Sequence, residues 1–178
     1  DSLAFISAFK EASFLKKAGF NEDSALGMYL LNTYEVYWNT SAESFRDKML
    51  KAYNVFWTPA RDSKAKKIGL NREGVMALAS IVQKETAKED GRPRVAVVYV
   101  IRITLRMPLQ ADPTVIFAKK RAENDYNQVI KRVLYKDLEI DSPYNTYKNL
   151  GVPPGPISMP DVSAIKAVLN YENHEQLY

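Results

Sequence analysis

The sequence has 178 residues, of which 46% are hydrophobic, 26% charged and 11% aromatic, a balance typical of one globular domain and not of a disordered or fibrous segment. Its net charge of +4 is a mild bias toward anionic partners and does not by itself indicate nucleic-acid binding. With no cysteine and a single histidine, His174, the chain lacks the residues for zinc fingers, thiol catalysis, disulfide scaffolds and most histidine-based triads. We therefore expect no metal site, and no ligand role for His174.

The first third of the chain is predicted to be helical and rich in aromatic residues. Apolar residues among lysines and serines over residues 3–18 predict one or two short amphipathic helices, with Gly19 as the stop signal. The aromatic, partly β-branched run over residues 29–38 is too short for a full helix and predicts a strand or an extended segment. We interpret the aromatic side chains of this run as groups that pack in the core or against a subdomain, and not as a surface that binds a ligand. These side chains are Tyr34, Tyr37 and Trp38.

Two segments follow whose boundaries carry clear signals. Thr40 and Glu43 have the spacing of a capping box, and apolar residues at helical spacing predict a helix from there to Pro59. The basic segment 61–67 is best interpreted as a solvated helix end or connector, because a short run of lysines alone does not make a polyanion site. Asn71 is predicted to cap the next helix.

The helix after Asn71 is apolar over most of its circumference, so we expect it to be the buried core helix. Residues 93–105 are almost all apolar or β-branched, and periodicity alone leaves them open as a buried strand or a helix. Seven of the nine prolines lie beyond residue 105, which predicts short elements separated by loops. A last helix is predicted from Asp161, as its N-cap, to about residue 169.

Glu85 is the first candidate for chemistry. In a helix that starts near Arg72, it follows Leu78 by seven residues and Ile81 by four, so helical spacing places its carboxylate on the apolar stripe. A carboxylate that is partly withdrawn from water has a raised pKa and suits a general acid near neutral pH. The alternative, which periodicity alone favours, is a glutamate that emerges into solvent near a helix end.

The segment LQADPTV, residues 109–115, is the second candidate. Asp112 before Pro113 is a good N-cap followed by a proline in the first turn, so a structural role explains both residues. Gln110 and Thr114 flank this helix start with short hydrogen-bonding side chains, where ligand groups are commonly received.

The third candidate combines SPYNTY, residues 142–147, with the proline-stiffened GVPPGPI, residues 151–157. Flat aromatic faces beside amide and hydroxyl groups are what a sugar-binding surface requires. A surface loop whose prolines and glycines only fix its path is an equally good interpretation. The polar and aromatic side chains that we single out here are Tyr144, Asn145 and Tyr147.

Taken together, the three candidate segments resemble, in order and with compatible spacing, the successive motifs of the YceG-like family, the endolytic murein transglycosylases. ASIVQKET at residues 79–86 resembles the first motif, LQADPTV the second, and SPYNTY with GVPPGPI the third. NTYEVYWNTS at residues 32–41 also resembles a family segment that leads into the catalytic domain. The resemblance covers about residues 26–169.

This resemblance implies a membrane-anchored lytic transglycosylase that cuts peptidoglycan glycan strands internally and leaves 1,6-anhydro-N-acetylmuramic acid ends. By motif, Glu85 falls on the catalytic glutamate, which protonates the glycosidic oxygen and then accepts the proton of the C6 hydroxyl. Substrate contacts are implied for Gln110, Thr114, Tyr144, Asn145 and Tyr147, and no metal or organic cofactor is implied. The implied fold is α+β but mainly helical, a lysozyme-like catalytic domain with small β elements and proline-rich loops, in which residues 93–105 are helical.

We expect a helical and aromatic lead-in over residues 1–70 and a catalytic part over residues 71–178. The resemblance also implies further carboxyl-terminal residues and an anchor helix in the inner (cytoplasmic) membrane, with the domain facing the periplasm and peptidoglycan synthases as possible partners. The chain is therefore expected to be a fragment of a longer protein.

The sequence departs from the family pattern at Leu31, at Ile101, and at Arg106, which takes the place of the glycine in a Gly-Met pair. Two competing hypotheses are a module that binds peptidoglycan or a cell-wall synthase without turnover, and a basic nucleic-acid-binding domain with steep salt dependence.

Overall fold

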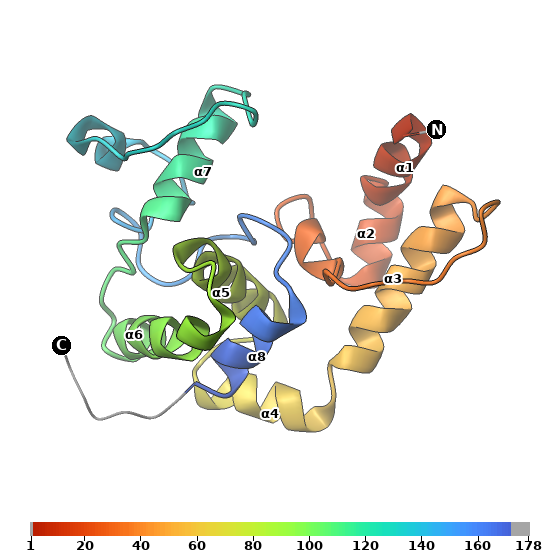
Figure 1. Cartoon of the computed structure of the whole chain (residues 1–178), viewed down its shortest axis with the longest axis horizontal. Coiled ribbons are helices and arrows are strands. Elements are labelled where there is room, and N and C mark those ends of the chain that lie inside the picture. The colour runs from red at the N-terminus through yellow and green to blue at the C-terminus, as the bar shows by residue number, and fades with distance from the viewer. Residues whose placement is uncertain (1, 172–178) are drawn as a thin grey trace.

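A computed structural model describes residues 2–171, which fold into helices joined by loops (Figure 1). The α-helices are α1 (Ser2–Phe9), α2 (Ala12–Ala18), α3 (Ala42–Phe56), α4 (Pro59–Lys67), α5 (Arg72–Glu85), α6 (Arg92–Thr104), α7 (Asp112–Ala122) and α8 (Val162–Leu169). Three short 3-10 helices are η1 (Ala25–Met28), η2 (Glu89–Gly91) and η3 (Tyr135–Glu139). The prediction of a mainly helical chain is confirmed. His174, for which no ligand role was expected, lies outside the described residues.

Of the two forms predicted for residues 29–38, a strand or an extended segment, the strand is wrong. The β pairing in the described part of the chain is one isolated parallel bridge, between Leu31 and Asp161. The rest of the segment is neither helix nor paired strand. Packing was also wrong for two of its aromatic side chains, because Tyr37 is 84% exposed and Trp38 is 98% exposed. Tyr34 does pack, with its ring edge-on to Phe45.

The helices α1, α2 and α3 form one side of the molecule, apart from the helices around α5 (Figure 1). Aromatic rings fill the space between α1 and α3: Phe5 and Phe9 lie 5.8 and 6.1 Å from the ring of Phe45. The guanidinium of Arg46 lies 3.7 Å from the centre of the Phe14 ring and donates a hydrogen bond to Glu11. Gly19 ends α2 with a left-handed φ of 84°, as its place after the helix predicted.

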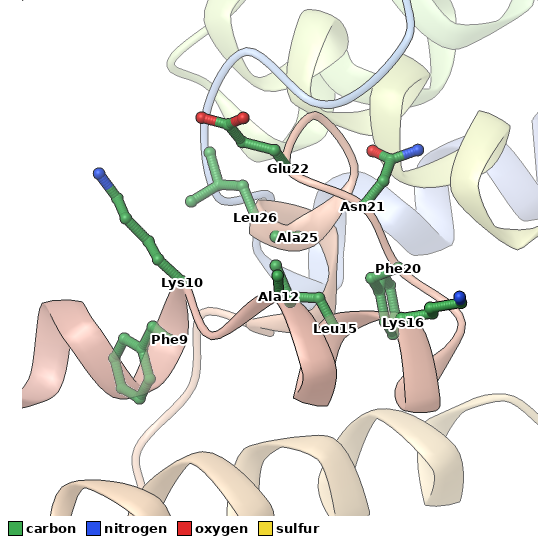
Figure 2. Close-up of a pocket in the computed structure, with 10 residues that line it drawn as sticks. All are labelled: Phe9, Lys10, Ala12, Leu15, Lys16, Phe20, Asn21, Glu22, Ala25 and Leu26. Carbon is green, nitrogen blue, oxygen red and sulfur yellow. The ribbon is translucent and has the colours of Figure 1, made fainter.

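A hollow of about 700 Å³ opens beside these amino-terminal helices (Figure 2). Its walls are mainly apolar and come from α1, α2 and η1, with Lys10, Lys16 and Glu22 among the lining residues. None of the residues predicted to carry chemistry lines it.

The start of α3 differs by one residue from the prediction. Ser41, and not Thr40, is the N-cap, because the Ser41 hydroxyl accepts a hydrogen bond from the Ser44 backbone N–H at 3.1 Å. The next helix, α4, has Thr58 as its N-cap and Pro59 in its first turn. Pro59 was predicted only as the end of the preceding helix, and it also begins the next one. Lys64, Lys66 and Lys67 on α4 are exposed, which agrees with the interpretation of residues 61–67 as a solvated helix end.

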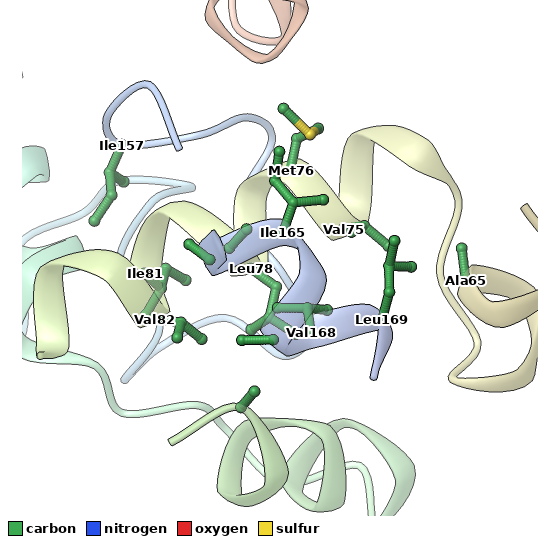
Figure 3. Packing of buried hydrophobic residues seen from close by; sticks show 14 of the residues in the cluster. Ala65, Val75, Met76, Leu78, Ile81, Val82, Ile157, Ile165, Val168 and Leu169 are labelled. Atoms are coloured by element: carbon green, nitrogen blue, oxygen red, sulfur yellow. The ribbon is translucent and has the colours of Figure 1, made fainter. Parts of the chain in front are cut away.

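The core is centred on α5, which packs against α6, α7 and α8 (Figure 3). Asn71 caps α5 as predicted, by accepting the Gly74 N–H at 2.8 Å. From Val75 to Val82 the apolar side chains of α5 are at most 1% exposed, and Ile165 and Val168 of α8 are fully buried against them. Burial of a large aliphatic side chain contributes about 1.5–3 kcal/mol, so this contact stabilises the fold substantially.

Polar side chains of α5 attach the proline-rich loop before α8 to the core. The hydroxyl of Ser80, fully buried, accepts the Ile157 N–H at 3.0 Å. The side chain of Gln83 accepts the Asp161 N–H at 2.7 Å. Gly155 lies so close to the Asp23 backbone that an added Cβ would be 1.9 Å from the Asp23 carbonyl oxygen. A glycine is therefore required where this loop crosses the loop before η1.

Residues 93–105 form a helix, α6, which answers the choice that periodicity left open. Arg92 at its start is 7% exposed in its side chain, and its guanidinium lies 2.8 Å from both carboxylate oxygens of Asp161, the N-cap of α8. None of the helices in residues 2–171 combines the length and apolar composition needed to cross a lipid bilayer.

Candidate active site

Glu85 is the last residue of α5, and its side chain is exposed. Of the two alternatives open from the sequence, the one that periodicity favours, a glutamate that emerges into solvent near a helix end, is confirmed, and a carboxylate withdrawn from water is not. Ile81 and Val82 are fully buried, but the helix leaves the core after them, and Lys84 and Glu85 emerge into solvent. The apolar stripe on which the expectation depended thus ends before Glu85.

The nearest structural support for Glu85 is a tyrosine of the neighbouring helix. Tyr99 of α6 is 6% exposed, and burial is the main cause of its strongly raised pKa. The negative charge of Glu85 and a hydrogen bond between the two side chains raise the pKa of Tyr99 further. Tyr99 therefore holds its phenol group beside the carboxylate of Glu85.

Sequence reasoning missed Tyr99. The available signal was a tyrosine and an arginine, Tyr99 and Arg102, three residues apart in an otherwise apolar helix. Side chains with this spacing share a helix face, and buried polar ends need partners. Arg102 is half-buried and donates a hydrogen bond to the Leu109 carbonyl, so it connects the end of α6 to the loop before α7.

That loop, residues 109–114, is joined to residues 144–147 by hydrogen bonds centred on Thr146. The Gln110 N–H donates to the Thr146 carbonyl at 3.1 Å, and the Ala111 N–H donates to the Thr146 hydroxyl at 3.0 Å. The hydroxyls of Thr114 and Thr146 lie 2.8 Å apart. These bonds are buried, so the two loops form one rigid unit. Thr146 was not among the predicted residues, because its partners lie more than 30 positions away in sequence.

Gln110 stands at the rim of this unit with its side chain exposed. Its φ of 52° lies in the left-handed region, where a residue with a Cβ is disfavoured. The hydrogen bond to Thr146 holds the backbone there. Strained backbone of this kind persists only where the surroundings impose it and is common at functional sites.

Asp112 was predicted to be the N-cap of α7 and is not. The helix begins at Asp112 itself, Ala111 is the N-cap residue, and no side chain caps the helix. The Asp112 carboxylate instead accepts a hydrogen bond from the Tyr147 hydroxyl, at 2.6 Å. The Asp112 carboxylate thus bonds to Tyr147, across the loop, and not to the backbone at the start of α7.

Tyr147 is half-buried between the two acidic side chains of the site. Its pKa is raised to about 12, first by burial, then by the hydrogen bond to Asp112 and the charge of Asp112, and then by the charge of Glu85. Arg102 acts in the opposite direction. The structure thus brings Glu85, Asp112 and Tyr147 into one electrostatic neighbourhood.

Three of the predicted contact residues have buried side chains. Thr114 is fully buried and donates to the Ala111 carbonyl at 2.7 Å. Asn145 is fully buried and donates to the carbonyls of Leu138 and Ile140 at 2.8 and 2.9 Å. These bonds give both residues a role in holding the loops, and their contact with a ligand stays a prediction.

Tyr144 is 1% exposed, and its side chain contacts the amino-terminal half of the chain. Its hydroxyl lies 3.1 Å from Asp23, and the guanidinium of Arg121 lies 5.0 Å from the centre of its ring. Burial raises its pKa to about 12, and Asp23 adds to this effect. The ligand contact predicted for Tyr144 likewise stays a prediction.

Two of the positions that depart from the family pattern lie near the end of α6, whereas Leu31 lies in the bridge to Asp161. Ile101 is half-buried in α6, and Arg106 is exposed with a left-handed φ of 54° at the end of that helix. Within residues 2–171, no three His, Cys, Asp or Glu side chains gather in a way that would hold a metal ion.

Comparisons with known proteins agree with the motifs. A model of the YceG-like family matches residues 3–178. An endolytic murein transglycosylase of Bacillus subtilis (strain 168) is 38% identical over 140 residues, which are 79% of this chain and 37% of that protein. An endolytic murein transglycosylase of Streptococcus pneumoniae serotype 2 (strain D39 / NCTC 7466) is 33% identical over 147 residues, 82% of this chain and 26% of that protein.

A solved structure of a YceG-like protein from Listeria monocytogenes is similar over the whole of this chain and 61% of that one, with a TM-score of 0.72 and 30% sequence identity. The chain spans well under half the length of the two transglycosylases that it matches.

Proposed function

This chain belongs to the YceG-like family, and from that membership we propose that it is the part of a lytic transglycosylase that cleaves peptidoglycan glycan strands. The observation that carries the proposal is the placement of Glu85. It is the exposed carboxylate at the end of the core helix, beside Tyr99 and in the same neighbourhood as Tyr147 and Asp112. Relatives named endolytic murein transglycosylases, 38% and 33% identical, support the choice of reaction.

In the proposed reaction Glu85 first acts as a general acid. Its proton goes to the glycosidic oxygen between N-acetylmuramic acid and N-acetylglucosamine, and the bond from that oxygen to C1 breaks. The C6 hydroxyl of the same N-acetylmuramic acid then attacks C1, and its proton passes to Glu85. The product end is a 1,6-anhydro ring, and no water is consumed. A hydrolytic glycosidase generally needs a second carboxylate to activate water or to attack the sugar.

The neighbours of Glu85 have positioning roles in this scheme. The buried phenol of Tyr99 fixes the carboxylate at the end of α5. Gln110 and Tyr147, held by the bonded loops, form the wall that receives the glycan. Thr114, Asn145 and Tyr144 are proposed to support this wall from within the loops, since their side chains are buried. Glycan rings stack well on a tyrosine face and bond to an amide, which fits this pair of side chains.

The division of labour along the chain is part of the same proposal. Residues 71–178 would be the catalytic part, with a lysozyme-like arrangement around the glutamate, and residues 1–70 the lead-in. The protein would be held in the inner membrane by a helix outside these 178 residues and act on its periplasmic side. Peptidoglycan synthases are the partners that such a location makes available.

The proposal is tested by digesting purified peptidoglycan with the parent and with Glu85→Gln, followed by mass spectrometry of the released glycans. We expect anhydro ends, lighter than reducing ends by one water, and a loss of about 100-fold or more in their rate of formation in Glu85→Gln. Glu73→Gln is the matched control, because Glu73 lies in the first turn of the same helix.

Reducing ends in place of anhydro ends would contradict the lytic reaction. Binding of glycan with no cleavage by the parent would instead support the binding-module hypothesis.

A further inference from the structure

Asp112 has a position that helix capping does not explain. It is the first residue of α7, an 11-residue helix, and its side chain makes no cap hydrogen bond. The carboxylate is exposed, and one oxygen, Oδ1, accepts the Tyr147 hydroxyl at 2.6 Å. Within residues 2–171 the second oxygen has no hydrogen-bond or ionic partner.

The fold supports a negative charge at this point. The amino-terminal end of a helix carries a partial positive charge, which stabilises an anionic side chain in the first turn. A phenol that donates to one oxygen of a carboxylate adds a charge-assisted hydrogen bond. Asp112 is thus a carboxylate held in place by Tyr147 and by the helix, without a cation bridged to it.

The position is also rigid and close to the candidate acid. Residues on both sides of Asp112 are fixed, since Ala111 and Thr114 bond to Thr146. The helix that carries Asp112 packs against the helix that ends at Glu85. The Tyr147 hydroxyl bonds directly to Asp112, and the charges of both Asp112 and Glu85 raise the pKa of Tyr147. Arg102 is the cation of the same region, and its guanidinium is engaged by the Leu109 carbonyl.

We propose that Asp112 is a second catalytic carboxylate, which stabilises the positive charge that develops at the anomeric carbon while Glu85 transfers the proton. This inference rests on the proposed transglycosylase function. Asp112 forms no covalent bond in the reaction: the bond from C1 to the glycosidic oxygen breaks, the bond from C1 to O6 forms, and the proton passes through Glu85. The Tyr147 hydroxyl occupies Oδ1 and lowers the nucleophilicity of the carboxylate, which disfavours an ester with the sugar.

Such a role predicts selectivity for a cation over a neutral ligand of the same shape. The probes are two disaccharides that begin with N-acetylglucosamine: one ends in an azasugar protonated at the anomeric position, the other in the corresponding neutral sugar. Calorimetric titration of the whole chain with each probe measures the preference. We expect Asp112→Asn to weaken binding of the cationic probe by about 100-fold and to change binding of the neutral probe by less than about 3-fold.

Tyr147→Phe separates charge stabilisation from loop positioning. This variant keeps the Asp112 charge and loses only the hydroxyl, so we expect it to retain the preference for the cationic probe. Two results would overturn the catalytic role and leave Asp112 as a positioning residue for Tyr147. One is an equal loss of affinity for both probes in Asp112→Asn. The other is a selective loss of affinity for the cationic probe in Tyr147→Phe that matches the loss in Asp112→Asn.

The same titrations distinguish failure of this inference from failure of the proposed function. A selective loss of the cationic probe in Asp112→Asn, with no anhydro product from the parent, would support the role of Asp112 and reject the transglycosylase reaction. Anhydro product from the parent with an unchanged preference in Asp112→Asn would reject the role of Asp112 alone. Failure of the parent to bind either probe would overturn both.

Discussion

The starts of α7 and α8 use the same type of residue in opposite ways. Asp161 caps α8 by accepting the Ala164 N–H at 2.8 Å and pairs with the buried guanidinium of Arg92. Asp112 starts α7 without capping it, remains exposed, and is held by one tyrosine hydroxyl. An aspartate whose charge is fully engaged serves stability, whereas one that keeps an oxygen free beside another carboxylate is available for chemistry.

The surroundings of the two helices explain this difference. Around α8 the loop from residues 151 to 161 is bonded to Ser80 and Gln83 of the core helix, so the start of α8 is part of the core. Around α7 the loop is bonded to residues 144–147, which form the rim of the candidate site. The start of α8 is therefore bonded to the core, whereas the start of α7 is bonded to the rim of the candidate site.

The difference between Asp161 and Asp112 is tested most directly by removing each carboxylate in turn and measuring stability. Asp161→Asn removes the closer ionic partner of the buried Arg92 and leaves Glu89 at 3.9 Å, and we expect a loss of about 3 kcal/mol in the free energy of unfolding. Asp112→Asn removes an exposed carboxylate and should change stability by less than about 0.5 kcal/mol. Urea denaturation followed by circular dichroism measures both values, and losses of similar size would mean that Asp112 is structural after all.

The same pair predicts how stability depends on pH. Burial alone would raise the pKa of Asp161, but the hydrogen bond from the Ala164 N–H and the guanidinium of Arg92 outweigh it and lower that pKa. A carboxylate whose pKa is lowered by folding stabilises the protein above its unfolded pKa, near 4, and this contribution is lost as the pH falls through the folded pKa. Asp161→Asn should therefore lose less stability than the parent on acidification. Denaturation curves at pH 7, 5 and 3 measure this, and parallel losses in both proteins would contradict it.

Local signals in the sequence predicted the helices and several of their ends. Asn71 and Asp161 were identified as N-caps because a short polar side chain reaches an N–H three residues ahead, which involves no distant part of the chain. Gly19 was identified as a helix stop for a similarly local reason. The helix α6 needed the family resemblance, because a nearly all-apolar segment fits a strand as well.

Most of the differences involve partners that are distant in sequence. The strand alternative for residues 29–38 requires a neighbouring strand, which residues 2–171 do not supply. Asp112 was taken for a cap, whereas its carboxylate bonds to Tyr147, which lies 35 positions away. The shift of the N-cap from Thr40 to Ser41 is the local exception. The motifs therefore placed the candidate site in the sequence, while the contacts within it required the three-dimensional structure.

The start of α3 is a third helix start to set beside those of α7 and α8, because two candidate N-caps are adjacent in its sequence. Its variants have the smallest expected effect on the free energy of unfolding. The hydroxyl of Ser41 accepts the Ser44 N–H, whereas Thr40 lies just outside the helix. We expect Ser41→Ala to lower the free energy of unfolding by about 1 kcal/mol and Thr40→Ala to leave it nearly unchanged. Thermal denaturation of the two variants measures the difference. A larger loss in Thr40→Ala would restore the capping box that the sequence predicted, and the helix would then begin one residue earlier. The expected result would instead show that a helix boundary is set by the residue whose side chain accepts a free N–H of the first turn. Ser41 and Asp161 are such residues, and Asp112 is not.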